Sequence, residues 1–244
     1  MSPRASRGRR RERLPRAERV AEIMRVAREV FCDKGYAQAS TAQIAAQVGV
    51  VEGTLYRYFP SKRQLLVGVI EAFYESIFAD YEQQLQGVRG TWNRLRFLIW
   101  KHLSVLHGDP AMCRLIVHEL RPSPQYRQSS VFRLNQLYTE RTLAIVKEGI
   151  ARGEFEAQVP LRIVRDMIFG CAEHHSWAYL RGEGRFSPDE AADAITNLIY
   201  RGLARAGADK AATVAGSVQR LERAVQRLEG LRTPGRQRRG AAKC

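Results

Sequence analysis

The sequence predicts an all-α protein, with a small three-helix unit near the N-terminus and a larger helical domain after it. Apolar residues recur at helical spacing along most of the chain, as in Val20, Ile23, Met24, Ala27 and Val30. No segment alternates apolar and polar residues with the period of two that a half-buried strand requires. Glycine and proline residues stand between the apolar segments, where they end one helix and let the next begin.

The three-helix unit starts with a predicted helix from Ala17 to Gly35, because glycine readily adopts the left-handed conformation that closes a helix. The second helix follows Ser40, whose hydroxyl can accept a hydrogen bond from the backbone of Gln43. It closes at Gly49, which leaves a tight turn before the next segment.

Residues 52–59 are predicted to form the third helix. Leu55 and Phe59 lie four positions apart and therefore share its buried face. Pro60 stops this helix, and Ser61 caps a long helix after it.

The remaining chain is predicted to be helical, with helices near residues 91–107, 110–120, 124–152, 160–182, 187–206 and 210–231. Ser187 followed by Pro188 is a strong helix start, since serine caps and proline favours the first helical position. We divide the chain into five segments: a disordered arginine-rich arm (1–15), a three-helix domain (16–62), a larger helical domain (63–206), an extra helix (207–231) and a basic disordered tail (232–244).

Positive charge is concentrated at the two ends of the chain. The whole sequence has 40 Lys+Arg against 25 Asp+Glu, a formal net charge of +15. Residues 1–65 hold 14 basic and 6 acidic side chains, and residues 232–244 hold 5 basic ones and no acidic one. Residues 66–231 hold the remaining 21 basic and 19 acidic side chains and are nearly neutral. Such local excess predicts a polyanionic partner, nucleic acid or an anionic membrane surface.

The cysteines are far apart and form no CxxC pair, which favours free thiols in a reducing compartment. The N-terminal residues lack the apolar core of a secretory signal, and no run of about 18 apolar residues predicts a membrane span. We therefore expect a cytoplasmic protein without a membrane partner.

Two short helices joined by a glycine-containing turn predict a helix-turn-helix, whose second helix enters the major groove of double-stranded DNA. We expect Glu52, Thr54 and Arg57 to read bases, and Tyr56 and Lys62 to bind phosphates and set the register. The full set of predicted DNA contacts is Ser40, Thr41, Val51, Glu52, Gly53, Thr54, Tyr56, Arg57, Tyr58 and Lys62.

Residues 31–66 strongly resemble the DNA-binding domain of TetR-family (tetracycline-repressor-like) transcriptional regulators. The matching elements are F-x-x-K-G-Y, I-A-x-x-x-G-V and G-T-L-Y-R-Y-F-x-S-K-x-x-L-L. The resemblance implies an all-α homodimer on a palindromic operator, with a small-molecule pocket in the C-terminal domain and repression relieved by the ligand.

Two features depart from the family pattern. Val51 stands where a small hydroxyl residue usually caps the recognition helix, which removes a cap worth about 1 kcal/mol. Val51 could instead contact a thymine methyl group. The N-terminal arm is richer in arginine than the motif requires, and we expect it to contact phosphates or the minor groove.

The segments RLIVHELRPSP and RDMIFGCAEHHSWAYL are similar to the ligand domains of family members that sense fatty acyl-CoA. The resemblance implies a small apolar or CoA-thioester effector, with arginines to receive its phosphates, for which Arg162 and Arg165 are further candidates. The predicted ligand contacts are Trp100, Leu103, Arg114, Arg121, Met167, Cys171, His174 and Trp177. Ordinary core packing is the alternative for each apolar member, and an exposed, solvated side chain is the alternative for each arginine.

The dimer is expected where the helices at 160–182 and 187–206 meet their copies, through a stripe of Ile195, Leu198, Ile199 and Leu203. Cys171, His174 and His175 share one helix face that could suit a metal, but helix packing explains them more simply. We therefore expect neither a metal nor a cofactor.

Two other function classes remain. A non-specific architectural DNA-binding protein would act through the two basic ends, with a steep dependence on salt and little sequence preference. An enzyme is disfavoured, since the sequence has no G-x-S-x-G, H-E-x-x-H or glycine-rich phosphate loop. Activation instead of repression also remains open.

Overall fold

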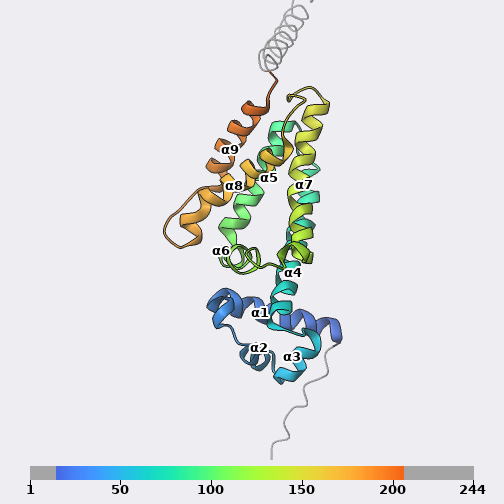
Figure 1. Cartoon of the computed structure of the whole chain (residues 1–244), viewed down its shortest axis with the longest axis vertical. Helices are drawn as coiled ribbons and strands as arrows, with labels where there is room; N and C mark the ends of the chain where they lie inside the picture. Colours follow the sequence, from blue (N-terminus) through green and yellow to red (C-terminus); the bar gives the residue numbers. More distant parts are fainter. Residues whose placement is uncertain (1–14, 206–244) are drawn as a thin grey trace, which may run out of the picture.

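The computed structural model describes residues 15–205, and within this range the chain forms helices and no β-strand. The predicted all-α fold is therefore confirmed. The lower part of the molecule in Figure 1 contains α1 (Arg16–Gln38), α2 (Thr41–Val48), α3 (Glu52–Tyr58) and the start of α4 (Lys62–Leu85). Helix α4 then continues upward and joins this part to the rest of the protein.

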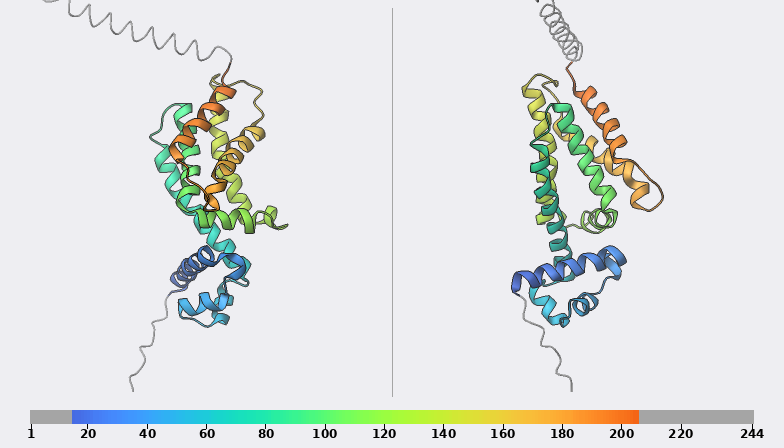
Figure 2. Two further views of the ribbon diagram at one scale, coloured as in Figure 1. Left: turned by 90° about the vertical axis from the view of Figure 1, so that its left-hand side faces the viewer. Right: turned by 180° about the vertical axis from the view of Figure 1, so that it is seen from behind.

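The larger part consists of antiparallel and crossed helices above the first three (Figure 2). Its elements are α5 (Thr91–Gly108), α6 (Pro110–Arg114), the π-helix η1 (Leu115–Leu120), the 3-10 helix η2 (Tyr126–Gln128), α7 (Ser130–Ala151), α8 (Leu161–Leu180) and α9 (Pro188–Leu203). Helix α9 packs mainly on α5.

The predicted helix boundaries hold for most elements, and three differ. Helix α1 continues past its predicted end at Gly35 to Gln38, with Gly35 at φ 74° and ψ 165° forming a kink inside it. The segment expected as one helix at 110–120 changes from α-helix to π-helix at Leu115. The helix expected at 124–152 begins only at Ser130, because Ser129 Oγ accepts a hydrogen bond from the backbone N–H of Phe132 over 3.1 Å and caps it there. The helix predicted at 210–231 lies outside the described residues.

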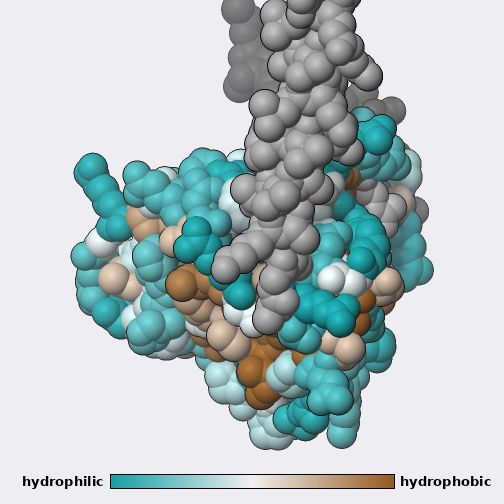
Figure 3. Space-filling view, turned by 90° about the horizontal axis from the view of Figure 1, so that it is seen from above, coloured by the Kyte–Doolittle hydropathy of each residue, from teal (hydrophilic) through white to brown (hydrophobic). Residues whose placement is uncertain are grey.

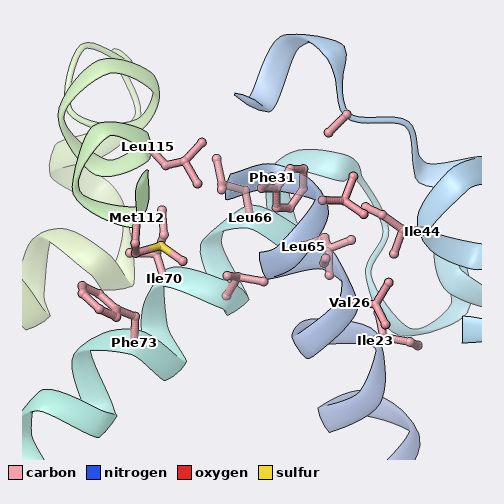
Figure 4. Close-up of a cluster of buried hydrophobic side chains, with 14 of the residues drawn as sticks. Ile23, Val26, Phe31, Ile44, Leu65, Leu66, Ile70, Phe73, Met112 and Leu115 are labelled. Atoms are coloured by element: carbon pink, nitrogen blue, oxygen red, sulfur yellow. The ribbon is translucent and has the colours of Figure 1, made fainter. Parts of the chain in front are cut away.

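One hydrophobic core continues from the part that contains α1, α2 and α3 into the larger part. Figure 4 shows Phe31 of α1, Ile44 of α2 and Leu66 of α4 in one group with Met112 and Leu115 of the larger part. All five side chains are buried. The core therefore joins the two parts through packed side chains, so that a shift in one displaces the other.

A second core lies higher in the molecule, between α5, α7, α8 and α9. Leu95, Ile99 and Leu103 of α5 are buried against Ile195 and Ile199 of α9. This packing fixes α9 on the protein and determines which of its faces is left outward.

Candidate DNA-binding surface and ligand cavity

Helix α3 is joined to α2 by a tight turn. Gly49 ends α2 with φ 77° and ψ 36°, in the left-handed region that glycine adopts without strain. The backbone N–H of Val50 donates to the carbonyl oxygen of Ala45 over 2.9 Å and closes the turn. Leu55 is fully buried beneath α3. The opposite face of α3 is therefore outward, in the arrangement of a helix-turn-helix.

The outward face of α3 carries several of the side chains predicted to contact DNA. Val51, directly before the helix, is 74% exposed, and Tyr56 and Arg57 are also exposed. A Cβ at Gly53 would meet no described heavy atom within 4 Å, so the backbone there is open to close approach. Thr54 is half-buried beside them.

The hydroxyl of Thr41 in α2 forms hydrogen bonds with both Glu52 and Tyr56 of α3. Its Oγ1 donates to Glu52 Oε1 over 2.6 Å and lies 3.1 Å from Tyr56 Oη. A hydroxyl carries one proton, so Thr41 donates to Glu52 and accepts from Tyr56. Thr41 is only 8% exposed. Its hydroxyl thus orients Glu52 and Tyr56, and a phosphate that binds Tyr56 Oη competes with Thr41 for the phenol proton.

Other predicted contacts have partners inside the protein. Lys62 Nζ donates to the carbonyl oxygen of Ala37 over 3.2 Å and lies 4.5 Å from the centre of the Tyr36 ring. Tyr58 is half-buried against the core, and Ser40 Oγ caps α2. The contacts of Lys62 hold the start of α4 against α1, Tyr58 packs α3 on the core, and Ser40 closes the start of α2. These residues therefore have structural roles beside any contact with DNA.

Replacing Arg57 with alanine is expected to weaken operator binding by about 1–3 kcal/mol and to relax the preference at one base pair, because Arg57 is exposed at the reading face. The Tyr56→Phe variant removes only a phenol hydroxyl and should weaken binding to all sequences alike. Fluorescence anisotropy with an operator and its single-base variants measures both effects. Equal loss of base preference in the two variants would contradict this division of roles.

The larger part encloses a cavity of about 700 Å³ that opens to solvent. Its apolar wall comes from several helices and includes Phe73, Ile77, Val105, Leu106, Ile116 and Phe169. The size and lining are typical of sites for small organic ligands. The cavity therefore provides the pocket that the resemblance implied.

Of the eight residues predicted to contact a ligand, the structure places Arg121 in the cavity wall. The other seven lie elsewhere. Trp100 and Leu103 belong to the upper core, and Arg114 Nη1 donates to the carbonyl oxygen of Leu180 over 2.8 Å. On α8, the four remaining residues face away from the cavity and are exposed: Met167, Cys171, His174 and Trp177.

The face of α8 that lines the cavity is a different one. It carries Arg162, Arg165, Phe169 and Glu173, spaced three or four positions apart. Successive side chains of an α-helix point in directions about 100° apart. A row of residues shifted by one or two positions therefore lies on a different face of the helix. Two candidates from the sequence, Arg162 and Arg165, are on this face, whereas the four other residues predicted on α8 are on the exposed one.

The charged groups that line the cavity differ in exposure. Arg127 and Arg162 are exposed and therefore lie where the cavity opens, and Arg165 pairs with its neighbour Asp166. Arg121 is half-buried and forms an ion pair with Glu173. The arginines at the opening are suited to a negatively charged part of a ligand.

His102 of α5 is a cavity residue that the sequence interpretation missed. Burial, and secondarily the positive charge of Arg121, lowers the pKa of its imidazole to about 3, so the ring is neutral at physiological pH. Its position between Ile99 and Leu106, which are both buried on α5, was the available signal. The histidine was one position away from a residue that we predicted.

The lowered pKa of His102 predicts a pH-dependent stability. In the unfolded chain histidine titrates near about 6.5. Between that pKa and the folded value of about 3 the unfolded state binds one more proton, so the free energy of unfolding falls as the pH is lowered, by up to about 1.4 kcal/mol per pH unit. Urea denaturation of the wild type and a His102→Asn variant at several pH values measures this slope. Identical slopes for both proteins would contradict the assignment.

The residues predicted for a dimer divide into two groups. Ile195 and Ile199 are buried in the upper core, and Leu203 packs against that core. Leu198 is 73% exposed on the outward face of α9. Figure 3 shows the molecule from above, from the end at which α9 stops. Hydrophobic patches lie near the centre of this view, with hydrophilic residues around them.

The cavity and the DNA-binding helices are connected by direct contacts. Arg63 of α4 donates to the carbonyl oxygen of Glu119 in η1 over 2.9 Å. Arg28 of α1 forms an ion pair with Asp109, which caps α6. Helix η1, which packs on α1, also contributes Ile116 to the cavity wall. Displacement of this wall by a ligand would therefore reach α1 and α4.

The described residues contain no helix long and apolar enough to cross a membrane. Within the same range, no group of three or more His, Cys, Asp or Glu side chains is arranged to hold a metal ion.

Comparison with known proteins identifies both parts of the chain. The family model for bacterial regulatory proteins of the tetR family matches residues 23–69, and that for the tetracyclin repressor-like C-terminal domain matches residues 89–203. The fatty acid metabolism regulator protein of Bacillus subtilis (strain 168) is 26% identical over 182 residues, which cover 75% of this chain and 94% of that protein. The nucleoid occlusion factor SlmA of Serratia proteamaculans (strain 568) is 28% identical over 186 residues, which cover 75% of this chain and 92% of that protein.

A crystal structure of the transcriptional regulator FadR from Bacillus subtilis, in complex with stearoyl-CoA, superimposes with a TM-score of 0.67 at 26% identity. It covers 75% of this chain and 98% of that one. These matches confirm the predicted DNA-binding regulator and do not favour an enzyme or an architectural protein. The chain belongs to the TetR family of bacterial regulatory proteins.

Proposed function

We propose that this protein is a cytoplasmic homodimeric repressor that leaves a palindromic operator when a fatty acyl-CoA occupies its cavity. The proposal rests above all on one observation, which is that α4 belongs to both sites. Leu65 and Leu66 of α4 lie in the core beneath the DNA-binding helices, and Phe73, Tyr74 and Ile77 line the cavity two to three turns later. A ligand that moves this helix changes the position of α3.

The choice of ligand class is supported by two features of the cavity. Its inner wall is apolar, as an acyl chain requires, while Arg127, Arg162 and Arg165 stand where it opens and can pair with CoA phosphates. The related Bacillus subtilis FadR was crystallised with stearoyl-CoA. Arg121 remains our proposed ligand contact from the sequence, whereas the seven others are better assigned to packing or to the outer surface.

For the dimer, we propose an interface formed by the outward faces of α8 and α9. Ile163 and Met167 of α8 and Leu198 of α9 are large apolar side chains exposed on the single chain. A two-fold axis there would pair each patch with its copy. The two α3 helices could then occupy half-sites separated by about 34–36 Å, one turn of DNA.

For the DNA contacts, we retain the residues expected from the sequence, with Val51, Gly53 and Arg57 the most accessible of them. Glu52 and Tyr56 act together with Thr41. The domain limits at residues 16–62 and 63–206 remain a proposal, and the arm before Pro15 and the segments at 207–231 and 232–244 lie outside the described residues.

The proposal is tested by selecting genomic fragments with purified protein at about 150 mM salt, where non-specific phosphate binding is weak, and sequencing them. We expect enrichment of a short palindrome, and its loss from the selected pool when stearoyl-CoA is added. Broad enrichment without a motif would instead favour a non-specific DNA-binding protein. A motif that is enriched equally with and without stearoyl-CoA would contradict a fatty acyl-CoA as the effector.

A further inference from the structure

The cavity wall holds buried polar atoms that have no hydrogen-bond partner among the described residues. Among residues 15–205, His102 Nε2 is buried and has no hydrogen-bond partner, and the same is true of Arg121 Nε. Both residues line the cavity. A buried polar atom without a partner costs free energy, and such atoms mark places where a ligand can supply the missing group.

The ring of His102 is held in one orientation by two aromatic neighbours. The Phe169 ring meets it edge to face at 4.9 Å between centres, with 81° between the planes. On another side Tyr138 Oη lies 3.3 Å from His102 Nδ1. A ring fixed in this way presents Nε2 in a constant direction, as a ligand-reading group must.

The contact with Tyr138 indicates which nitrogen of His102 carries the proton. Tyr138 is buried, and burial raises the pKa of its phenol well above the usual range, so the hydroxyl keeps its proton. Among the described residues the Tyr138 hydroxyl has no hydrogen-bond partner other than Nδ1, so its proton is used only if it donates to this nitrogen. The neutral imidazole then has its proton on Nε2. The unused atom is therefore a donor, and its missing partner is an acceptor.

The electrostatics of the wall indicate that this acceptor is uncharged. His102 is neutral, and the charge of the adjacent Arg121 is balanced by its ion pair with Glu173. The nearby cation, Arg121, already pairs with Glu173, and a second carboxylate placed here would be repelled by that of Glu173. A neutral carbonyl oxygen needs only the donor that His102 offers.

We propose that His102 Nε2–H donates a hydrogen bond to the thioester carbonyl oxygen of the acyl-CoA effector and so determines the specificity of the cavity for thioesters. The inference depends on the proposed ligand class and adds the residue that recognises its carbonyl. Along α8 the exposed Arg162 and Phe169, whose ring contacts His102, are seven residues apart, which is about 10 Å. The phosphates can thus remain at the opening while the carbonyl lies inside.

A matched pair of ligands tests this directly. Palmitoyl-CoA and S-hexadecyl-CoA differ in the carbonyl oxygen, which the thioether lacks. Isothermal titration of the full-length protein should give an affinity about tenfold higher for the thioester, because the thioether leaves the buried donor unpaired. In a His102→Phe variant, which keeps an aromatic ring at this position, the two ligands should bind with equal affinity.

His107→Phe is the matched control, because this histidine is on the same helix but is exposed and stacks on Tyr179, 4.9 Å between ring centres. It should retain the tenfold preference. Equal affinities of the wild type for both ligands would overturn the role of His102 while leaving the proposed acyl-CoA effector intact. Failure of both ligands to bind would overturn the effector class as well. The comparison on the wild type alone decides the matter if His102→Phe does not fold.

Discussion

Replacing Leu198 with arginine is expected to convert the dimer into monomers and to lower operator affinity by more than about a hundredfold. Leu198 is 73% exposed on the single chain, so the substitution costs the monomer little. In the proposed interface the arginine would be buried without a partner, which costs several kcal/mol. Each monomer then presents one α3 helix instead of two, and the second half-site no longer contributes to binding.

Sedimentation equilibrium and operator titration measure the two effects. Leu137→Arg is the control, since Leu137 is 58% exposed on α7, outside the proposed interface. It should leave both the mass and the affinity unchanged. A Leu198→Arg protein that remains dimeric would show that the apolar patch on α8 and α9 is not where the subunits meet.

Truncating Leu66 to alanine should lower the free energy of unfolding by about 2–5 kcal/mol, the usual cost of removing a buried leucine side chain. Leu66 is fully buried in the core that α1, α4 and η1 share. The loss should also loosen the contact between the two parts of the protein. We therefore expect weaker operator binding together with a smaller effect of the ligand on it.

Urea denaturation followed by circular dichroism gives the stability. Val51→Ala provides the comparison, because Val51 is 74% exposed and its truncation should change stability by less than about 0.5 kcal/mol. Val51→Ala tests DNA contact without altering the core. Equal stability of Leu66→Ala and the wild type would contradict a shared, tightly packed core.

Local sequence signals were sufficient to predict the DNA-binding helices. Ser40, Gly49 and Pro60 act through their own backbone and side chains, so their effects can be read without knowing the rest of the fold. Leu55 was placed on the buried face by its spacing, and it is fully buried. The interaction of Thr41 with Glu52 was not predicted, because it depends on how α3 turns against α2.

The cavity was less predictable, for a physical reason. Helix α8 packs on several neighbours, so more than one of its faces carries apolar residues, and periodicity does not tell which face lines a cavity. Met167 and Phe169 differ by two positions, yet the first is exposed and the second lies in the cavity wall. The π-helix at Leu115 also had no signal in the apolar pattern, which α- and π-helices share over six residues.

The measurement that tests the central claim most directly is operator affinity by fluorescence anisotropy, with and without saturating stearoyl-CoA and with CoA alone as the control. If the cavity communicates with α3 through α4 and η1, stearoyl-CoA should lower operator affinity by about 5- to 150-fold, the usual range of coupling between sites, and CoA should have little effect. Stearoyl-CoA that binds the protein while operator affinity stays constant would contradict this coupling.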